Sequence, residues 1–259
     1  MTSVNAEENS ENSRGGSHFS ELLKVQGKLT FREGREVIGI AVPVGLLLVF
    51  ALISSAEPGN QGNTGYTVLD LYIPVVMVLG FVFLAIGLPS TLVRDREIGW
   101  LRRVSTTPVS PSRLLAAQLI INLIFALVTV LIVIFGGEVV FGAGLDVNVP
   151  LFVISIILSI AVIFSLGMVL AAIAPSQAAA TGLSGAFAFG LMFLSGLWTP
   201  PELVGGPLAT IIYYSPSGAA VRALLDSVFN QPPPYTTLVA LVVYAVIFAF
   251  IAIRYFRWE

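Results

Sequence analysis

The sequence contains no cysteine and very little charge. Only 11% of its 259 residues are charged and 56% are hydrophobic, whereas a soluble domain carries about a quarter charged residues. The absence of cysteine excludes disulfide bonds and thiolate metal sites. The net charge of −2 gives no indication of a nucleic-acid partner. A chain of this length cannot bury so much apolar surface in a soluble core, so the composition predicts an integral membrane protein.

Charge is entirely absent from six apolar segments, each close to the length of about 20 residues that a spanning helix needs. They are Val37–Ser54, Tyr72–Leu92, Leu114–Phe135, Pro150–Ile173, Ala179–Trp198 and Tyr235–Ile253. We therefore predict an all-α membrane protein with six transmembrane helices. Residues 19–259 are expected to form one transmembrane domain, and the polar residues 1–18 a disordered cytoplasmic tail.

Basic residues are missing from two of the loops, and this asymmetry predicts the orientation of the chain. Of the 13 Lys and Arg residues, five precede the first span, five lie in the loop after the second span and two follow the last span. Lys and Arg gather in cytoplasmic loops. We therefore expect a multi-pass protein of the cell membrane in which the second loop and both termini are cytoplasmic.

Two regions that flank the spans are amphipathic or too short to cross a bilayer. Over residues 19–31, apolar side chains alternate with polar and charged ones, which predicts an interfacial helix on the inner membrane face. Before the last span, the apolar pieces Leu208–Tyr214 and Gly218–Phe229 are shorter than a spanning helix. They predict an outer re-entrant helical pair.

The predicted spans lack the groups that couple transport to an ion gradient. None contains Asp, Glu, Lys, Arg or His, and ionisable residues within the membrane mark ion and proton pathways. The chain also lacks the GxxxxGK[ST] phosphate-binding loop, so it does not bind ATP by that route. An uphill transporter built in this way needs an external energy source. A stand-alone channel or facilitator is the alternative.

The tetrapeptide GLSG at 182–185 offers an enzymatic alternative. A serine in this pattern occurs in intramembrane serine proteases, but a serine nucleophile needs a base within hydrogen-bond reach. The one histidine, His18, lies in the predicted cytoplasmic tail. We therefore favour small residues that let helices pack closely, with an intramembrane serine hydrolase as the weaker alternative.

The charge that the spans lack is concentrated in the loop Val93–Gln118, which holds five arginines. Residues 97–104 predict a short helix with Trp100 and Leu101 on one face. Pro108 ends it, and Ser110 is the expected N-cap of the next helix. A basic loop can act only as a topology signal, but an apolar and aromatic edge beside arginines is typical of a docking surface.

The same loop resembles that of ABC-2-type permeases, the membrane subunits of a class of ATP-binding-cassette exporters that includes daunorubicin-resistance permeases. The resemblance lies in DREIG at 95–99, Leu101, TTPVS at 106–110 and the leucine pair at 114–115. A second similarity is the segment YSPS at 214–217, ending at Arg222, ahead of the last span. The family has an asparagine where this chain has the serine before Pro216.

The resemblance implies the missing energy source. In this family the first cytoplasmic loop forms a coupling helix that docks on a separate ATPase subunit, which binds ATP and magnesium. It implies that this chain is not itself an enzyme and binds no cofactor or metal. A second permease, identical or related, completes the exporter, whose cargo is a drug, lipid, glycan or peptide. The implied contact residues for the ATPase are Glu97, Gly99, Trp100, Leu101 and Arg103.

The fifth span has a face of small and aromatic residues. At 100° per residue this face includes Gly182, Ala186, Phe189, Gly190 and Phe193. Small residues four apart permit close helix packing, and packing alone is one interpretation. The other is that the face lines the pathway of an amphipathic cargo. The resemblance implies that the second span contributes too, through Phe81 or Phe83.

Overall fold

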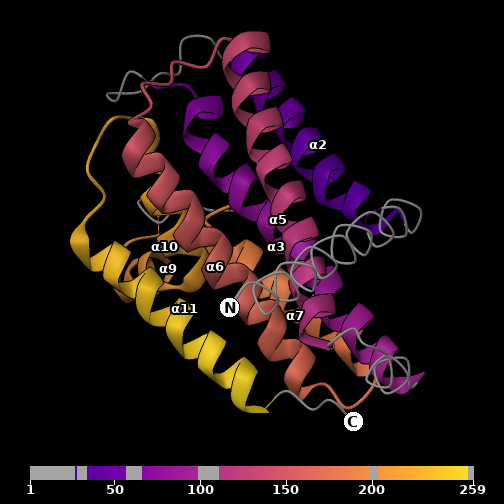
Figure 1. Ribbon diagram of the computed structural model, residues 1–259. Coiled ribbons are helices and arrows are strands. Elements are labelled where there is room, and N and C mark those ends of the chain that lie inside the picture. The colour runs from indigo at the N-terminus through magenta and orange to yellow at the C-terminus, as the bar shows by residue number, and fades with distance from the viewer. Residues whose placement is uncertain (1–26, 28–33, 57–65, 99–110, 199–203, 256–259) are drawn as a thin grey trace, which may run out of the picture.

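The computed structural model describes Gly27 and residues 34–56, 66–98, 111–198 and 204–255. Over these ranges the chain is almost entirely helical (Figure 1). The tail 1–18 and nearly all of the predicted interfacial helix over 19–31 lie outside the described residues. The elements are α2 (Arg35–Ala56), α3 (Val68–Glu97), α5 (Pro111–Phe135), the π-helical turn η1 (Gly136–Val140), α6 (Val149–Ile173), α7 (Gln177–Leu194), α9 (Gly206–Tyr214), α10 (Pro216–Val228) and α11 (Tyr235–Tyr255).

Six helices of the described part of the chain are long and apolar enough to cross a membrane, namely α2, α3, α5, α6, α7 and α11. This confirms the prediction of an all-α fold with six spans. Most helix ends differ from the predicted bounds by one to five residues, and two of these differences have a clear structural cause or consequence. α3 continues past Leu92 to Glu97, and α7 ends at Leu194 rather than Trp198 because Gly196 adopts a positive φ of 80°, which is typical of a helix terminus.

α3 lies at the centre of the helical assembly and is the most deeply buried of the six long helices. It packs against α2, α5, α6, α7 and α10, and Figure 1 shows α2 and α5 on one side of it and α6 and α11 on the other. A helix that is apolar on all sides is expected in such a position. Its N-terminal end is fixed by a capping box, in which Thr67 and Asp70 exchange hydrogen bonds of 2.7 and 3.2 Å.

A glycine of the neighbouring helix faces Pro43 in α2, and another faces the carbonyl that Pro89 leaves without a helical partner in α3. Pro89 has no N–H, so the Ala85 carbonyl of α3 loses its helical partner. A Cβ on Gly167 of α6 would come within 3.0 Å of that oxygen. A Cβ on Gly80 would likewise lie 3.0 Å from Cγ of Pro43 in α2. The close approach of α3 to both neighbours therefore depends on a missing side chain.

The short helices α9 and α10 occupy the positions predicted for the outer pair. α10 begins at Pro216, and Ser215 is its N-cap, accepting the Gly218 N–H at 3.0 Å. Its 13 residues extend about 20 Å, less than the bilayer core of about 30 Å. α10 packs against α6, α11, α3 and α7. The Ser155 hydroxyl of α6 lies 3.0 Å from that of Ser227.

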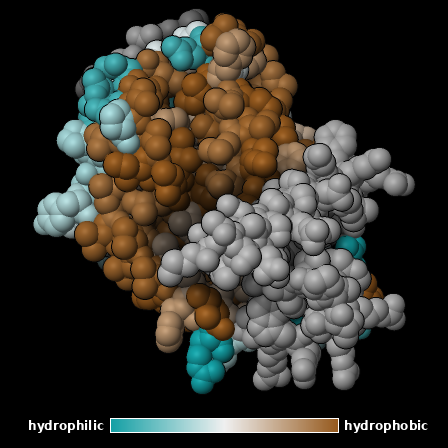
Figure 2. All heavy atoms as spheres, in the orientation of Figure 1, coloured by the Kyte–Doolittle hydropathy of each residue, from teal (hydrophilic) through white to brown (hydrophobic). Residues whose placement is uncertain are grey.

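The described residues on the surface in view are mostly apolar (Figure 2). Figure 2 shows a continuous hydrophobic face, with hydrophilic residues gathered at its upper left edge and at the bottom. The side chains that form such a surface include Leu131, Ile157, Val246 and Phe250, each more than half exposed. Exposed apolar area on this scale is expected of a protein whose solvent is lipid.

Candidate functional site

The charged loop begins at the last turn of α3. Glu97 is the final residue of α3, whereas Gly99, Trp100, Leu101 and Arg103 lie outside the described residues. The predicted helix over 97–104 therefore falls almost wholly outside them too. α5 begins at Pro111, the position that the sequence predicts. The structure thus describes both ends of the loop and, in detail, the contacts of the end that belongs to α3.

Arg96 and Glu97 both bind the turn between α6 and α7. A guanidinium nitrogen of Arg96 donates to the Ala174 carbonyl at 2.6 Å. The Glu97 carboxylate accepts the backbone N–H of Gln177 at 3.1 Å. Ala174 is the C-cap of α6 and Gln177 is the first residue of α7. The last turn of α3 is therefore bonded to the point at which α7 begins.

An apolar cluster lies beside these two hydrogen bonds. Val93 of α3, Ala174 and Ala180 are almost completely buried against one another, and Leu183 packs on them. Ala180 and Leu183 belong to the first two turns of α7. The polar and apolar contacts together join the last turns of α3 to the start of α7 over two helical turns. We call this contact, made by Val93, Arg96 and Glu97 with Ala174, Gln177, Ala180 and Leu183, the α3–α7 joint.

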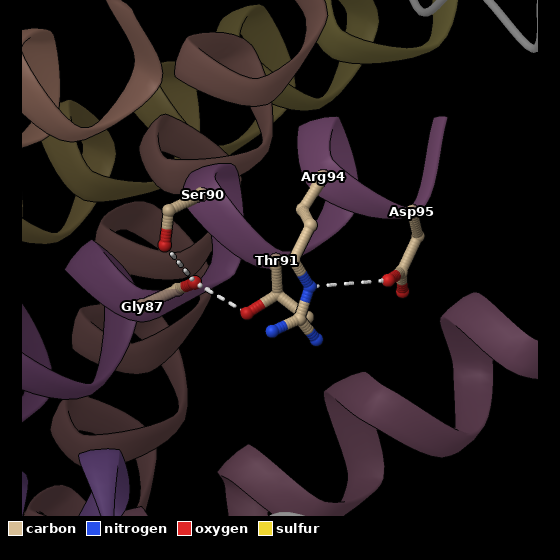
Figure 3. A network of polar contacts seen from close by, with 5 residues as sticks. All are labelled: Gly87, Ser90, Thr91, Arg94 and Asp95. Carbon is tan, nitrogen blue, oxygen red and sulfur yellow. Dashed lines mark hydrogen bonds and ion pairs between the residues drawn. The ribbon is translucent and has the colours of Figure 1, made fainter. Parts of the chain in front are cut away.

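The segment of α3 that leads to the joint carries a local polar network. The Gly87 carbonyl accepts hydrogen bonds from the hydroxyls of Ser90 at 3.1 Å and Thr91 at 3.0 Å. Figure 3 shows both hydroxyls pointing at this carbonyl, and the Arg94 guanidinium turned toward Asp95, 3.6 Å away. Pro89 lies within the same turn. Serine and threonine that bond to a preceding carbonyl tend to bend a helix, so the network marks a bend-prone turn.

The predicted pathway face of α7 is exposed in this chain. Phe189 is 65% exposed and Phe193 is 43% exposed. Gly182 and Ala186 are exposed as well, and Gly190 is half-buried. A Cβ added to Gly182, Gly185 or Gly190 would meet no atom within 4 Å. These glycines therefore make no close helix contact within the described part of the chain. Phe187, which the sequence argument did not single out, is exposed beside them.

A cavity of about 190 Å³ lies beside this helix, between α2, α3 and α7. Phe83 lines it together with Ile38 of α2 and Thr181 of α7, and Gly87 and Ser90 lie at its wall. Phe81, by contrast, is completely buried in the core. The structure thus brings Phe83 next to α7 and places Phe81 in the interior packing of this subunit.

Ser184 is buried, and its hydroxyl has no hydrogen-bond partner in the described part of the chain. It borders a cavity of about 20 Å³ whose other walls are apolar, including Val82, Leu166 and Phe187. Among the described residues that line this cavity there is no basic side chain. Across the described residues there is also no group of three His, Cys, Asp or Glu side chains that could hold a metal ion.

A comparison with protein families found a match that is consistent with the helical architecture. Residues 18–229 match the family model of the ABC-2 type transporter, and this stretch contains the charged loop, α2 to α7 and the outer helices α9 and α10. A comparison with curated proteins gave no match. The matched region covers well over half of the 259 residues. The chain therefore belongs to the ABC-2 type transporter family, a family of transport permease subunits with several membrane-spanning helices.

Proposed function

We propose that this chain is the permease of an ATP-binding-cassette exporter in the cell membrane, driven by a separate ATPase subunit that docks on the cytoplasmic loop Val93–Gln118. The observation that carries the proposal is the family match, which runs through this loop. Two features of the chain support it. Its predicted spans hold no ionisable side chain, and the loop continues directly from α3, the most buried helix.

A second permease, identical or related, completes the exporter in this proposal. The exposed face of α7 supports a partner or a pathway there, because its glycines make no close contact within the described chain. A soft aromatic surface beside small residues suits an amphipathic or hydrophobic cargo such as a drug or lipid. Phe83, Phe189 and Phe193 are the side chains that we expect the cargo to meet, with Gly182, Ala186 and Gly190 leaving room for it.

The ATPase contact is tested with a double substitution in the loop. Trp100 and Leu101 are expected to fill an apolar cleft of the ATPase, and truncating a central anchor typically costs about 2 kcal/mol or more. That loss weakens binding about thirtyfold. Trp100→Ala/Leu101→Ala is compared with Thr106→Ala/Thr107→Ala in the same loop, and the measurement is the amount of ATPase that co-purifies with the permease.

The expected result is loss of the ATPase from the Trp100→Ala/Leu101→Ala variant and its retention by the threonine control. If both variants keep the ATPase, the loop is only a topology signal. If the wild-type permease moves cargo in vesicles that contain no ATPase, it is a stand-alone facilitator and the proposal is wrong.

A further inference from the structure

We infer that the α3–α7 joint carries the displacement of the charged loop into α7, and that Arg96 and Glu97 are the positioning residues that hold it together. This inference rests on the proposed function, in which an ATPase pushes on the loop. It adds the route by which a displacement of the loop reaches α7, the helix with the exposed aromatic face. The loop itself is not needed to state the geometry, because every residue of the joint is described.

The two hydrogen bonds of the joint have the polarity that helix ends require. The last carbonyls of a helix lack partners and carry partial negative charge, and its first N–H groups carry partial positive charge. Arg96 places a cation on the final carbonyl of α6 at 2.6 Å. Glu97 places an anion on the first N–H of α7 at 3.1 Å. Adjacent residues of α3 therefore bind both sides of one turn, each with the favourable sign.

Apolar packing prevents the turn from sliding along α3. Val93 lies one turn before Glu97 and is almost completely buried against Ala174 and Ala180. The small side chains of Ala174 and Ala180 let the backbones of α3 and α7 come close. Because packed interfaces switch between discrete arrangements rather than deform continuously, the last turn of α3 and the first turns of α7 are expected to move as one body.

Pro89 supplies the hinge for that body. It interrupts the hydrogen-bond ladder of α3 between the buried central turns and the joint. The hydroxyls of Ser90 and Thr91 compete for the Gly87 carbonyl in the same turn. Sharp bends in helices occur at prolines and at such serine or threonine insertions. The eight residues after Pro89, up to Glu97, are then a short lever that ends at the loop.

Movement of the lever has a direct consequence for the cavity of about 190 Å³ beside α7. Ser90 lies on the lever, Thr181 lies in the second turn of α7, and Phe83 lies on the fixed part of α3. When the lever and α7 move together relative to Phe83, the width of this cavity changes. The same motion repositions Phe189 and Phe193 further along α7.

The first test measures the joint without any partner. Arg96→Met/Glu97→Ala removes the donor at position 96 and the acceptor at position 97, whereas Arg96→Lys/Glu97→Gln keeps a donor at 96 and an acceptor at 97. Hydrogen exchange of the isolated permease in lipid nanodiscs is followed over residues 174–183. We expect the Met/Ala variant to exchange about fivefold to a hundredfold faster there, as loss of two net hydrogen bonds implies. The Lys/Gln variant should match the wild type. Equal exchange in all three proteins overturns the inference.

The second test asks whether the joint transmits a nucleotide-dependent movement of the ATPase to α7. The chain has no cysteine, so Phe189→Cys provides a single labelling site on α7. In the complex with its ATPase, the labelling rate with a membrane-permeable maleimide is compared without nucleotide and with ATP plus vanadate. We expect nucleotide to change the rate about fivefold or more, the usual size of coupling between sites. Arg96→Met, which leaves Glu97 and the other implied ATPase contacts unchanged, should lose this change while still binding the ATPase, and Arg96→Lys should keep it.

The outcomes separate the inference from the proposed function. If Arg96→Met keeps the full nucleotide response, the joint does not transmit the ATP-driven displacement and the inference is wrong. A wild-type complex that binds the ATPase but shows no nucleotide response on α7 also overturns the inference and leaves the proposed function standing. If the wild-type permease binds no ATPase at all, the proposed function itself fails.

Discussion

Gly218 illustrates how one absent side chain fixes the outer pair of helices. It lies in the first turn of α10, where a Cβ would collide with the Ile212 carbonyl and come within 2.8 Å of the Leu194 carbonyl. Both are backbone atoms, so no rotamer change can relieve the contact. The N–H of Gly218 is also the group that the N-cap Ser215 binds. Asparagine and serine cap helices about equally well, which explains why serine can stand where the family has asparagine.

We predict that Gly218→Ala destabilises the permease by about 2 kcal/mol or more, in the upper part of the range for overpacking. Gly45→Ala is the matched control, because a Cβ on Gly45 of α2 meets no atom within 4 Å and alanine favours a helix interior by up to about 1 kcal/mol. Thermal unfolding in detergent measures both. Equal midpoints for the two variants would show that α9 and α10 are not packed as described.

Asp226 is a partly buried carboxyl on α10, outside the six long helices. Burial raises the pKa of Asp226 from 3.8 to about 6, and Arg222 one turn earlier opposes the shift in part. Arg222 also lies over the Tyr213 ring, 4.7 Å from its centre. A raised pKa means that the folded protein binds the proton more tightly than the unfolded chain. The stability that this proton contributes is present below about pH 4 and is lost as the pH rises through about 6.

We therefore predict that the melting temperature of the wild type falls more between about pH 4 and pH 7, the window that spans the shift, than that of Asp226→Asn. The amide keeps the size of the side chain and removes its charge. At the upper pH the variant should be the more stable of the two. Parallel pH profiles for the two proteins would contradict the assignment of a raised pKa to Asp226.

The helices as elements were largely predictable, because a run of about 20 apolar residues has few alternatives in a membrane protein. Their exact ends were not. Hydropathy stops the second span at Leu92, whereas α3 runs to Glu97 because Arg96 and Glu97 find partners in the turn between α6 and α7. Those partners lie about 80 positions away in the chain, and no local sequence pattern predicts them.

The positions at which helices approach closely could not be predicted from the sequence either. The spacing of Gly182, Ala186 and Gly190 satisfies the small-residue rule for packing, yet a Cβ on Gly182 or Gly190 would meet open space. Among the glycines of the described residues, a Cβ would come within 3.0 Å of a neighbouring atom at Gly39, Gly80, Gly136, Gly137, Gly167 and Gly218. Which glycine meets a neighbour depends on how the helices cross, and that is set by the whole packing arrangement.

For α7 as an element, we predict that Phe189→Ala and Phe193→Ala change the relative transport of different amphipathic dyes more than they change the amount of folded permease. These side chains face outward, so their removal leaves no cavity in the core. Ala188→Leu on the buried side of the helix is the control, and it should lower the folded amount instead. Unchanged dye preference in both phenylalanine variants would assign this face to contact with a second permease alone.

At the scale of the whole molecule, α3 connects two polar regions at opposite ends of the helical assembly. At one end, the Asp70 carboxylate accepts the Gly144 N–H of the loop after η1 at 3.1 Å. At the other end, Arg96 and Glu97 bind the turn between α6 and α7. The side-chain amide of Asn230 donates to the Asp146 carboxylate at 3.2 Å. The segment between α10 and α11 is therefore bonded at the same end of the assembly as Asp70. The charge asymmetry of the sequence assigns the Arg96 end to the cytoplasm.

This orientation predicts the labelling of single cysteines in intact cells. Gly62→Cys, in the first loop, should react with a membrane-impermeant maleimide. Ser112→Cys, at the cytoplasmic start of α5, should react only after the membrane is permeabilised. The lack of native cysteine removes background reaction. Labelling of Ser112→Cys but not Gly62→Cys in intact cells would invert the topology and place the charged loop outside.

The most direct test of the central claim is to identify what the charged loop touches in the cell. A photo-reactive amino acid is placed at Trp100, and at Gly62 as the control on the opposite side of the membrane, and cross-linked products are identified by mass spectrometry. The account predicts that the Trp100 position cross-links to an ATP-binding-cassette ATPase and that the Gly62 position does not. Cross-linking of the Trp100 position to lipid alone, with no ATPase, would contradict the account.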